Sequence, residues 1–392
     1  MRDRKRRLLI PGAILLLLAV LLMGALAVRH YRHRSSGEIV FPSLPETPES
    51  DVWYRVDTEG TVSADGTGWH GMFRLGTEDR LVVYFYGGGI ALDDYTTARP
   101  YSLKSDGFYY DTEAKLRDYQ ATWGFGNLEE YTPFRNWSII AIPYTTGDLH
   151  IGQGIYPCTL VNGSFRTVRF RGYDNYEILM NQVRDLVGDP EAILITGTSA
   201  GGFGASLLAE DVETWFPKTD NVTVCIDSAL LLKEDWPETA RDLWQAPAEI
   251  ANRLHSDNIV LDALTSLHQN APETKILYTC SLRDAELTRF QSYVDTGTGV
   301  QTREAGDVFQ RNLTDMVSAI QGMDPEAGFY IWNAIPYSQE EGETLTRHTV
   351  LVSNYAREPL AGDKVFLDWI MDAVEGDVRS WGMDLLEPQN AA

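Results

Sequence analysis

The chain reads Ile193-Leu-Ile-Thr-Gly-Thr-Ser-Ala-Gly-Gly-Phe-Gly204 in the stretch that decides its fold class. The first residues form an apolar run typical of a buried strand, and Phe203 begins a run typical of a helix. Between them stands Ser199, flanked by Gly197 and Gly201. A tight turn from strand to helix exposes such a serine above the sheet, where the helix N-terminus favours negative charge. The pattern predicts that Ser199 is a nucleophile, with a plain structural turn as the alternative.

Further apolar runs predict the other strands of the same sheet, at 81–86, 137–142, 222–226 and 275–280. Apolar residues at helical spacing predict a helix over 174–187, between the second strand and the strand that precedes Ser199. Buried strands that alternate with helices are typical of an α/β fold with a mostly parallel sheet and helices on both faces. Residues 53–88 predict short antiparallel strands before it. Residues 230–270 predict a helical excursion, which is either a lid or a structural insertion.

A serine hydroxyl is a weak nucleophile and needs a base, which a carboxylate orients. In folds of this class the acid and then the histidine follow the serine along the chain. His255 and His268 fall in the helical excursion, whereas His348 lies near the end of the chain and is the predicted base. Asp284 follows the last apolar run and is the predicted acid. Asp227 follows the run before it and competes as the acid or as a pocket residue.

Three consecutive glycines, 87–89, directly follow a buried run. Glycine lets backbone N–H groups face a reacting atom, and a tetrahedral oxyanion needs such donors at fixed positions. The sequence predicts an oxyanion hole built from Gly87, Gly88 and the N–H of Ala200, which follows the serine. It predicts no cofactor and no metal site, because no Cys/His spacing fits zinc. The three cysteines, Cys158 among them, are too few for a disulfide framework.

Four stretches together resemble the pectin acetylesterase and Notum family of serine carboxylic-ester hydrolases. They are Tyr84-Phe-Tyr-Gly-Gly-Gly89, Ile142-Pro-Tyr-Thr-Thr-Gly-Asp-Leu-His-Ile-Gly152, Phe170-Arg-Gly-Tyr-Asp-Asn175 leading to Gly197-Thr-Ser-Ala-Gly-Gly202, and Ile226-Asp-Ser228. The resemblance covers 53–349 and identifies the chain as a bacterial member. It implies an α/β-hydrolase-like fold that removes acyl groups, with Ser199 as nucleophile, Asp284 as acid and His348 as base. The glycine run and Ala200 match the family's oxyanion hole.

The chain departs from the family pattern beside the predicted pocket. Ile90 and Ala91 stand where the family commonly has Trp and Cys, and Thr145 replaces the Cys of its Pro-Tyr-Cys. The disulfides of the eukaryotic members are therefore absent. The loop after the strand 137–142 supplies three further candidates for substrate binding, Tyr144, Asp148 and His150. Asp227, which competes as the acid, is the fourth candidate. The alternative for the Asp148 carboxylate is that it only ties its own loop.

The N-terminal residues differ sharply from the rest of the chain. Residues 1–34 hold 8 of the 33 Lys and Arg and 1 of the 56 Asp and Glu, and 8–28 contain no charge. As a helix, 8–28 would be about 31 Å long, enough to cross a bilayer. The basic residues before it predict a single-pass anchor with 52–392 outside the cell, joined through a proline-containing linker, 35–51. A secreted protein, cleaved near Ala27, is the alternative.

The sequence after residue 34 has 25 basic and 55 acidic residues, a net charge of −30. Such a domain repels nucleic acid and anionic lipid, and it offers no attraction for polyanionic pectin. We therefore expect a monomeric esterase acting on an acetylated glycan or another short acyl ester. Transfer of the acyl group to a sugar hydroxyl by the same residues is one alternative. An inactive, membrane-tethered glycan-binding module is another.

Overall fold

The structure is a computed structural model, and it describes residues 41–113 and 121–387. The chain divides into two compact units, Met1–Pro42 and Ser43–Ala392, and the fold below is that of the second. The predicted membrane segment, 8–28, lies outside the described residues and stays a prediction. No helix within the described ranges is long and apolar enough to span a bilayer.

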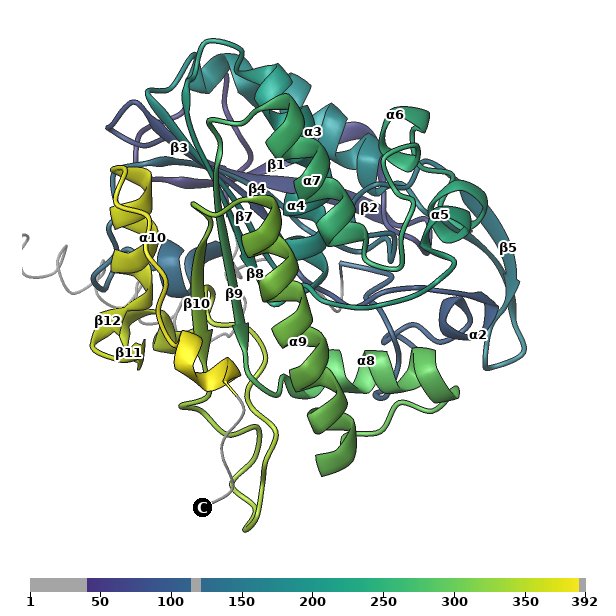
Figure 1. Cartoon of the computed structure of the whole chain (residues 1–392). Coiled ribbons are helices and arrows are strands. Elements are labelled where there is room, and N and C mark those ends of the chain that lie inside the picture. The colour runs from purple at the N-terminus through teal and green to yellow at the C-terminus, as the bar shows by residue number, and fades with distance from the viewer. Residues whose placement is uncertain (1–40, 114–120, 388–392) are drawn as a thin grey trace, which may run out of the picture. The chain divides into compact units, whose positions relative to one another are not determined.

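An eight-stranded sheet forms the centre of the second unit, in the order β1-β2-β4-β3-β7-β8-β9-β10 (Figure 1). The pairs β1–β2 and β2–β4 are antiparallel, and all the others are parallel, which confirms the mostly parallel sheet. The strands are β1 (Trp53–Val62), β2 (Gly68–Arg74), β3 (Arg80–Phe85), β4 (Ser138–Ile142), β7 (Ala192–Thr198), β8 (Asn221–Asp227), β9 (Lys275–Ser281) and β10 (Gly328–Trp332). Two small hairpins lie outside this sheet, β5 (Ile155–Thr159) with β6 (Phe165–Arg169) and β11 (Pro359–Ala361) with β12 (Lys364–Val365).

Helices cover both faces of the sheet, as predicted. Figure 1 shows α10 (Phe366–Val374) on one side of the strands and α4 (Ala200–Trp215) and α7 (Ile259–Asn270) on the other. The predicted amphipathic helix is α3 (Gly172–Val187), and the apolar positions read from the sequence are its buried face. The remaining long helices are α8 (Ala285–Thr296) and α9 (Arg303–Met323). All three cysteines are buried and free.

The excursion 230–270 is less regular than one long helix. It contains α5 (Trp236–Glu238), η3 (Thr239–Leu243) and α6 (Ala248–Ala251) before α7. Because α7 packs against α4, the last part of the excursion is one of the helices that cover the sheet. The other short turns of helix are α2 (Asp94–Thr97), η2 (Gly124–Gly126), η4 (Asn354–Arg357) and η5 (Met383–Leu386).

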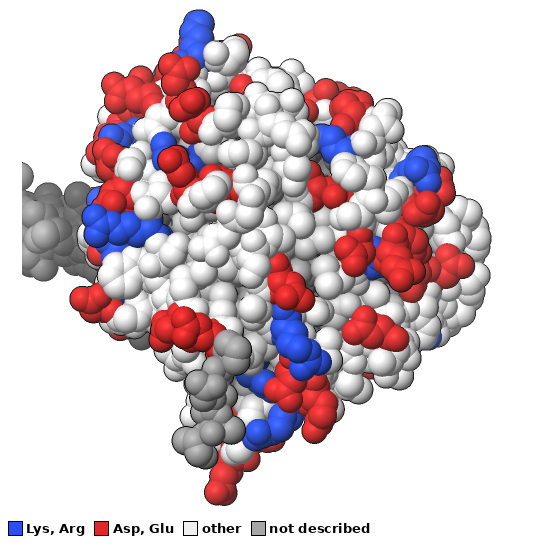
Figure 2. All heavy atoms as spheres, viewed as in Figure 1, with Lys and Arg blue, Asp and Glu red and all other residues white. Residues whose placement is uncertain are grey.

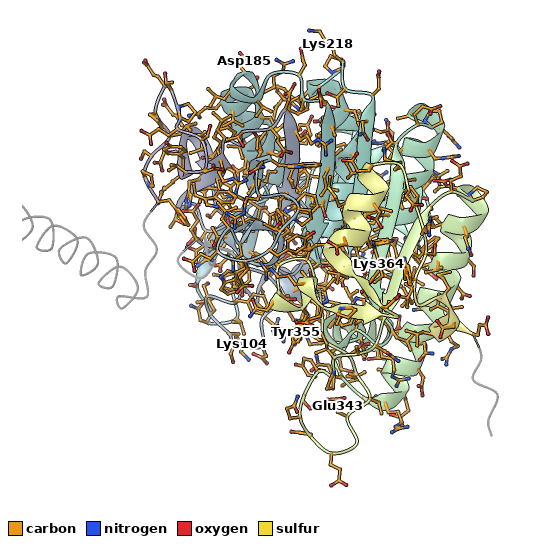
Figure 3. The ribbon with its side chains drawn as sticks, turned by 90° about the vertical axis from the view of Figure 1, so that its left-hand side faces the viewer. Lys104, Asp185, Lys218, Glu343, Tyr355 and Lys364 are labelled. Carbon is orange, nitrogen blue, oxygen red and sulfur yellow. The ribbon has the colours of Figure 1, made fainter. Side chains whose placement is uncertain are left out.

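The parallel register aligns the carboxyl ends of the three central strands. Thr198 at the end of β7 pairs with Asp227 at the end of β8, and Asp227 pairs with Thr279 near the end of β9. Side chains that follow these strands therefore meet at one edge of the sheet, where open α/β sheets bind ligands. In Figure 3, Tyr355 lies at this end, opposite Lys218, which precedes β8.

Candidate active site

Ser199 alone forms the turn between β7 and α4. Its backbone has φ 56° and ψ −125°, a left-handed conformation that costs a non-glycine residue on the order of 1–3 kcal/mol. The turn is also crowded, because a Cβ on Gly197 would lie 2.0 Å from the carbonyl oxygen of Gly201. A Cβ on Gly201 would lie 2.0 Å from the carbonyl oxygen of Phe85, so both glycines that flank the serine are needed for this turn. The Ser199 N–H donates to the carbonyl oxygen of Asp227 at 2.9 Å, which ties the turn to the neighbouring strand.

His348 and Asp284 form a hydrogen-bonded pair. The distance between His348 Nδ1 and Asp284 Oδ2 is 2.7 Å, and the Asp284 side chain is fully buried. The other carboxylate oxygen, Oδ1, accepts the N–H of Leu287 at 3.0 Å, because Asp284 is the N-cap of α8. Both oxygens are thus held, and a proton on Nδ1 leaves Nε2 free to accept one.

The backbone on either side of this pair is joined as well. Thr346 donates its N–H to the carbonyl oxygen of Arg283 at 2.9 Å and accepts the N–H of Ala285 at 3.0 Å. Its hydroxyl reaches Ser281 Oγ at 2.8 Å. These bonds fix the segments that carry the acid and the base against each other, so the imidazole has little freedom to leave the carboxylate.

The electrostatics of the pair favour a protonated imidazole. Burial lowers the pKa of His348, but the charge of Asp284 and its hydrogen bond outweigh burial, with a further contribution from Glu286. The pKa of His348 therefore lies above its ordinary value. An imidazolium formed when the base takes a proton is stabilised by the same carboxylate.

A cavity of about 320 Å³ contains both Ser199 and His348. Segments distant in sequence line it: the glycines 87–89, the aromatic residues Tyr101, Tyr110, Trp123 and Phe290, and the loop after Arg347. Glu286 and Arg347 are its charged lining residues among the described part of the chain. None of the described residues that line it comes from the excursion 230–270.

Gly87 lies against the serine, and Gly88 lies against two tyrosine rings. A Cβ on Gly87 would lie 3.0 Å from Ser199 Cβ, and one on Gly88 would lie 2.9 Å from ring atoms of Tyr110 and Tyr144. Within the described residues, the N–H groups of Gly87, Gly88 and Ala200 donate to no backbone carbonyl. Gly87 and Gly88 line the same cavity as Ser199, and Ala200 directly follows the serine, so their role as an oxyanion hole stays a prediction.

The comparisons with known proteins agree with this geometry. A family model described as Pectinacetylesterase matches residues 56–280. The chain belongs to the pectinacetylesterase family. Two crystal structures of the Wnt deacylase Notum from Drosophila are similar in fold, with TM-scores of 0.59 and 0.54 and 15% identity. The alignments cover 83% and 82% of this chain and 94% and 92% of those chains, and no curated protein sequence matches.

Membership of the pectinacetylesterase family makes the chain a hydrolase of carboxylic esters, and its fold is α/β-hydrolase-like. The family match ends at residue 280, before Asp284 and His348. Their assignment stays a prediction, which rests on the hydrogen-bonded pair and on the cavity that His348 shares with Ser199. In the described ranges, no cluster of three or more His, Cys, Asp or Glu side chains could hold a metal ion.

Four residues that the sequence placed at the substrate are not brought there by the structure. Tyr144, Asp148, His150 and Asp227 are buried and do not line the cavity of this family member. Asp148 accepts the Thr146 hydroxyl at 2.7 Å and the N–H of Gly172 at 2.8 Å, which ties its own loop to the start of α3. This is the alternative that the sequence left open.

His150 and Tyr144, on the same loop, also form buried hydrogen bonds to the backbone. His150 Nε2 lies 2.9 Å from the carbonyl oxygen of Tyr86, and burial lowers the pKa of His150 to about 4, so the ring is neutral. The Tyr144 hydroxyl accepts the N–H of Leu149 at 2.8 Å. The loop after β4 thus supports the glycine run from behind.

Sequence reasoning missed the aromatic lining of the cavity. The rings of Tyr101 and Tyr110 pack at an angle of 50° with centroids 4.9 Å apart, and the Tyr101 hydroxyl accepts a hydrogen bond from Arg289 Nη2 at 3.1 Å. Trp123 is 38% exposed, which is high for so large an apolar ring. The exposed ring lines the cavity of this family member. The sequence could not show this, because nothing distinguishes a cavity-lining aromatic residue from any other in a loop without periodicity.

Replacing Asp284 by asparagine is expected to lower kcat by about 10⁴-fold, because the imidazole loses the partner that fixes its tautomer. The acid limb of the kcat/KM profile should also move to lower pH. The base must be neutral, so activity is lost as the pH falls through the pKa of His348, and Asp284 raises that pKa. Initial rates from pH 4.5 to 9 measure both effects.

Asp324→Asn is the matched control for this variant, because Asp324 lies 4.0 Å from another histidine, His268. It should leave both kcat and the pH profile unchanged. An acid limb in Asp284→Asn at the wild-type position, with kcat reduced less than about tenfold, would contradict Asp284 as the acid.

Proposed function

We propose that this chain is a serine esterase that removes O-acyl groups, foremost O-acetyl groups of a carbohydrate, through an acyl-enzyme intermediate. One observation carries the proposal: Ser199, on its strained turn, shares a cavity with His348, and His348 is bonded to the buried Asp284. Family membership supports ester hydrolysis as the reaction.

In the first half-reaction, His348 Nε2 takes the proton of Ser199 Oγ as the oxygen attacks the ester carbonyl carbon. The carbonyl oxygen becomes an oxyanion, which the N–H groups of Gly87, Gly88 and Ala200 bind. The intermediate collapses when the C–O bond to the alcohol breaks and the imidazolium gives its proton to the leaving oxygen. The acyl group is then bonded to Ser199 Oγ, and Asp284 has remained ionised throughout.

In the second half-reaction, water takes the place of the alcohol. His348 accepts one proton from the water as its oxygen attacks the acyl carbon, and the same N–H groups bind the second oxyanion. Collapse breaks the bond to Ser199 Oγ, which regains its proton from His348. The products are the carboxylic acid and the free enzyme, so no atom or charge is left over.

The cavity and the surface charge bear on the substrate. A volume of about 320 Å³ is at the small end of ligand pockets, which favours a short acyl group. Acidic side chains are spread over the face shown in Figure 2, with Lys and Arg in small groups. A polyanionic chain would meet repulsion over such a surface. We therefore favour an acetyl ester on a weakly charged glycan.

Esters of p-nitrophenol with acetate, butyrate and octanoate test the proposal on the purified full-length chain. We expect kcat/KM to fall with chain length, with acetate at least tenfold above octanoate, because one methylene that a pocket cannot accommodate costs about 1–3 kcal/mol. The release of p-nitrophenol at 405 nm measures the rates. Octanoate as the best substrate would contradict the short acyl group, and no hydrolysis above buffer would contradict the esterase.

A further inference from the structure

Asp227, at the end of β8, carries a buried carboxylate that the mechanism above does not use. Its Oδ2 accepts two consecutive backbone N–H groups, those of Val350 and Leu351, each at 2.8 Å. Its Oδ1 accepts the hydroxyl of Ser228 at 2.9 Å. The side chain therefore holds the loop that begins two residues after His348.

The main chain of the same residue holds the nucleophile. Its carbonyl oxygen accepts the Ser199 N–H at 2.9 Å, and the register of β7 and β8 places Thr198 directly beside it. A Cβ on Gly202, in the first turn of α4, would lie 2.9 Å from this carbonyl oxygen. One residue thus contacts both the turn that carries the serine and the loop that carries the histidine.

The free energy of burial argues that these contacts matter. The Asp227 side chain is fully buried and forms no ion pair with a Lys or Arg of the described chain, and burying such a charge costs several kcal/mol. Burial raises its pKa to about 6, and the N–H groups of Leu351 and Val350 oppose this increase. The hydrogen bonds from the loop replace those that the carboxylate would form with water if it were exposed.

Two residues beside these hydrogen bonds have strained backbones. Thr349, between His348 and the two N–H donors, has φ 57°, and Ser228, directly after Asp227, has φ 61°. Each such residue costs about 1–3 kcal/mol and persists only when its surroundings hold it. The Asp227 carboxylate accepts the N–H of Val350, which directly follows Thr349, and the hydroxyl of Ser228.

We propose that Asp227 is a positioning residue, which sets the distance between Ser199 and His348 by bonding the segments of both. The inference rests on the proposed function, since it assigns a role within that reaction. It replaces the substrate-binding role that the sequence suggested for Asp227, because the side chain does not reach the cavity.

The charge of Asp227 acts on the base as well. Together with Asp284 and Glu286 it raises the pKa of His348. The other titratable groups influenced by this carboxylate are buried: Cys225 on the same strand, β8, Tyr278 and Cys280 on the neighbouring strand, β9, and Tyr84 on β3. None of these four titrates between pH 5 and 8, because burial raises the pKa of each.

Two substitutions in the full-length chain separate the hydrogen bonds from the charge. Asp227→Ala removes both, and it should lower kcat on p-nitrophenyl acetate by about 100-fold with KM changed less than twofold, as expected for misplacement of reacting groups by about 1 Å. Asp227→Asn keeps an oxygen for the two N–H groups. It should lose less than tenfold in kcat, with the acid limb of the pH profile at lower pH.

Asp262→Asn is a matched control, because Asp262 Oδ2 also accepts two consecutive backbone N–H groups, those of His255 and Ser256, each at 2.8 Å. It lies outside the cavity and should keep wild-type kcat even if it lowers the melting temperature. A rise in KM with kcat unchanged in Asp227→Ala would show a substrate contact and overturn the proposal. Wild-type kcat in that variant would also overturn it.

A readout without substrate separates this inference from the proposed function. The imidazole N–H shared by His348 and Asp284 should give a downfield proton NMR signal in the wild type and in Asp227→Asn, and the signal should be lost or broadened in Asp227→Ala. If the wild type hydrolyses no ester, the esterase proposal fails while this signal still tests the positioning role. An unchanged signal in folded Asp227→Ala would overturn that role, and if Asp227→Ala does not fold, the Asp227→Asn kinetics decide.

Discussion

Substitution of Ser199 by alanine is expected to lower kcat on p-nitrophenyl acetate by about 10⁵-fold, close to the background rate of hydrolysis. The hydroxyl is the only group of this residue that reaches the ester in the proposed reaction, and loss of a serine nucleophile removes the whole covalent route. The alanine keeps the strained backbone conformation of the turn, so the melting temperature should change little. Steady-state rates and circular dichroism on the purified chain measure the two quantities.

Ser206→Ala is the control for this variant. Ser206 lies on the same helix, α4, is buried, and donates its hydroxyl to the carbonyl oxygen of Phe203 at 2.8 Å, away from the cavity. Its removal should cost about 1 kcal/mol of stability and leave kcat within twofold. More than about 1% of wild-type activity in Ser199→Ala would place the nucleophile elsewhere.

Substitution of His348 by alanine is expected to lower kcat by a similar factor, about 10⁵-fold, because residues that act as a unit fail together. Without the imidazole, the serine proton has no acceptor and the leaving alcohol has no donor. Added imidazole should restore part of the rate, since the lost side chain leaves room beside Ser199. Rates at increasing imidazole concentration measure this rescue.

His255→Ala supplies the comparison, because the His255 side chain is 73% exposed and lies outside the cavity. Its rate should equal that of the wild type, with or without imidazole. If His348→Ala keeps activity within tenfold of the wild type, another group is the base, and the pair with Asp284 is structural.

The central strands could be predicted because a strand that is buried on both faces is a continuous run of apolar residues in the sequence. The runs at 81–86, 222–226 and 275–280 differ from β3, β8 and β9 by about one residue at either end. The apolar run before Ser199 ends at Ile195, whereas β7 continues through Thr196, Gly197 and Thr198, which are not apolar. β10 was missed although all five of its residues are buried.

Part of the candidate site was also predictable. The turn at Ser199 needs glycine at fixed positions, and the chain order of acid and base follows from the fold class. The pairing of His348 with Asp284 in the structure agrees with that order, although their catalytic roles stay predictions. The sequence does not indicate which segments surround the serine, because Tyr101 and Trp123 come from loops without periodicity or motif, and Phe290 comes from α8, a helix that the sequence analysis did not predict.

The position of Tyr144, Asp148 and His150 away from the cavity has a geometric cause. They follow β4, and the end of a parallel strand is a sound place to expect ligand contacts. The sheet order, however, is β4-β3-β7, so β3 and its glycine run stand between that loop and Ser199. Strand order is a long-range property, and no local pattern in these residues reports it.

The hydrogen bond between Asp284 and His348 joins residues 64 positions apart. The hydrogen bonds from Asp227 to Val350 and Leu351, on the loop that follows His348, span 123 and 124 positions. Ser199 is synthesised well before these partners, and a domain generally folds as a unit. The acid, the base and the hydrogen bonds of Asp227 can therefore assemble around the serine only after the last loop has been made. A chain that ends before residue 348 would carry the serine without its base.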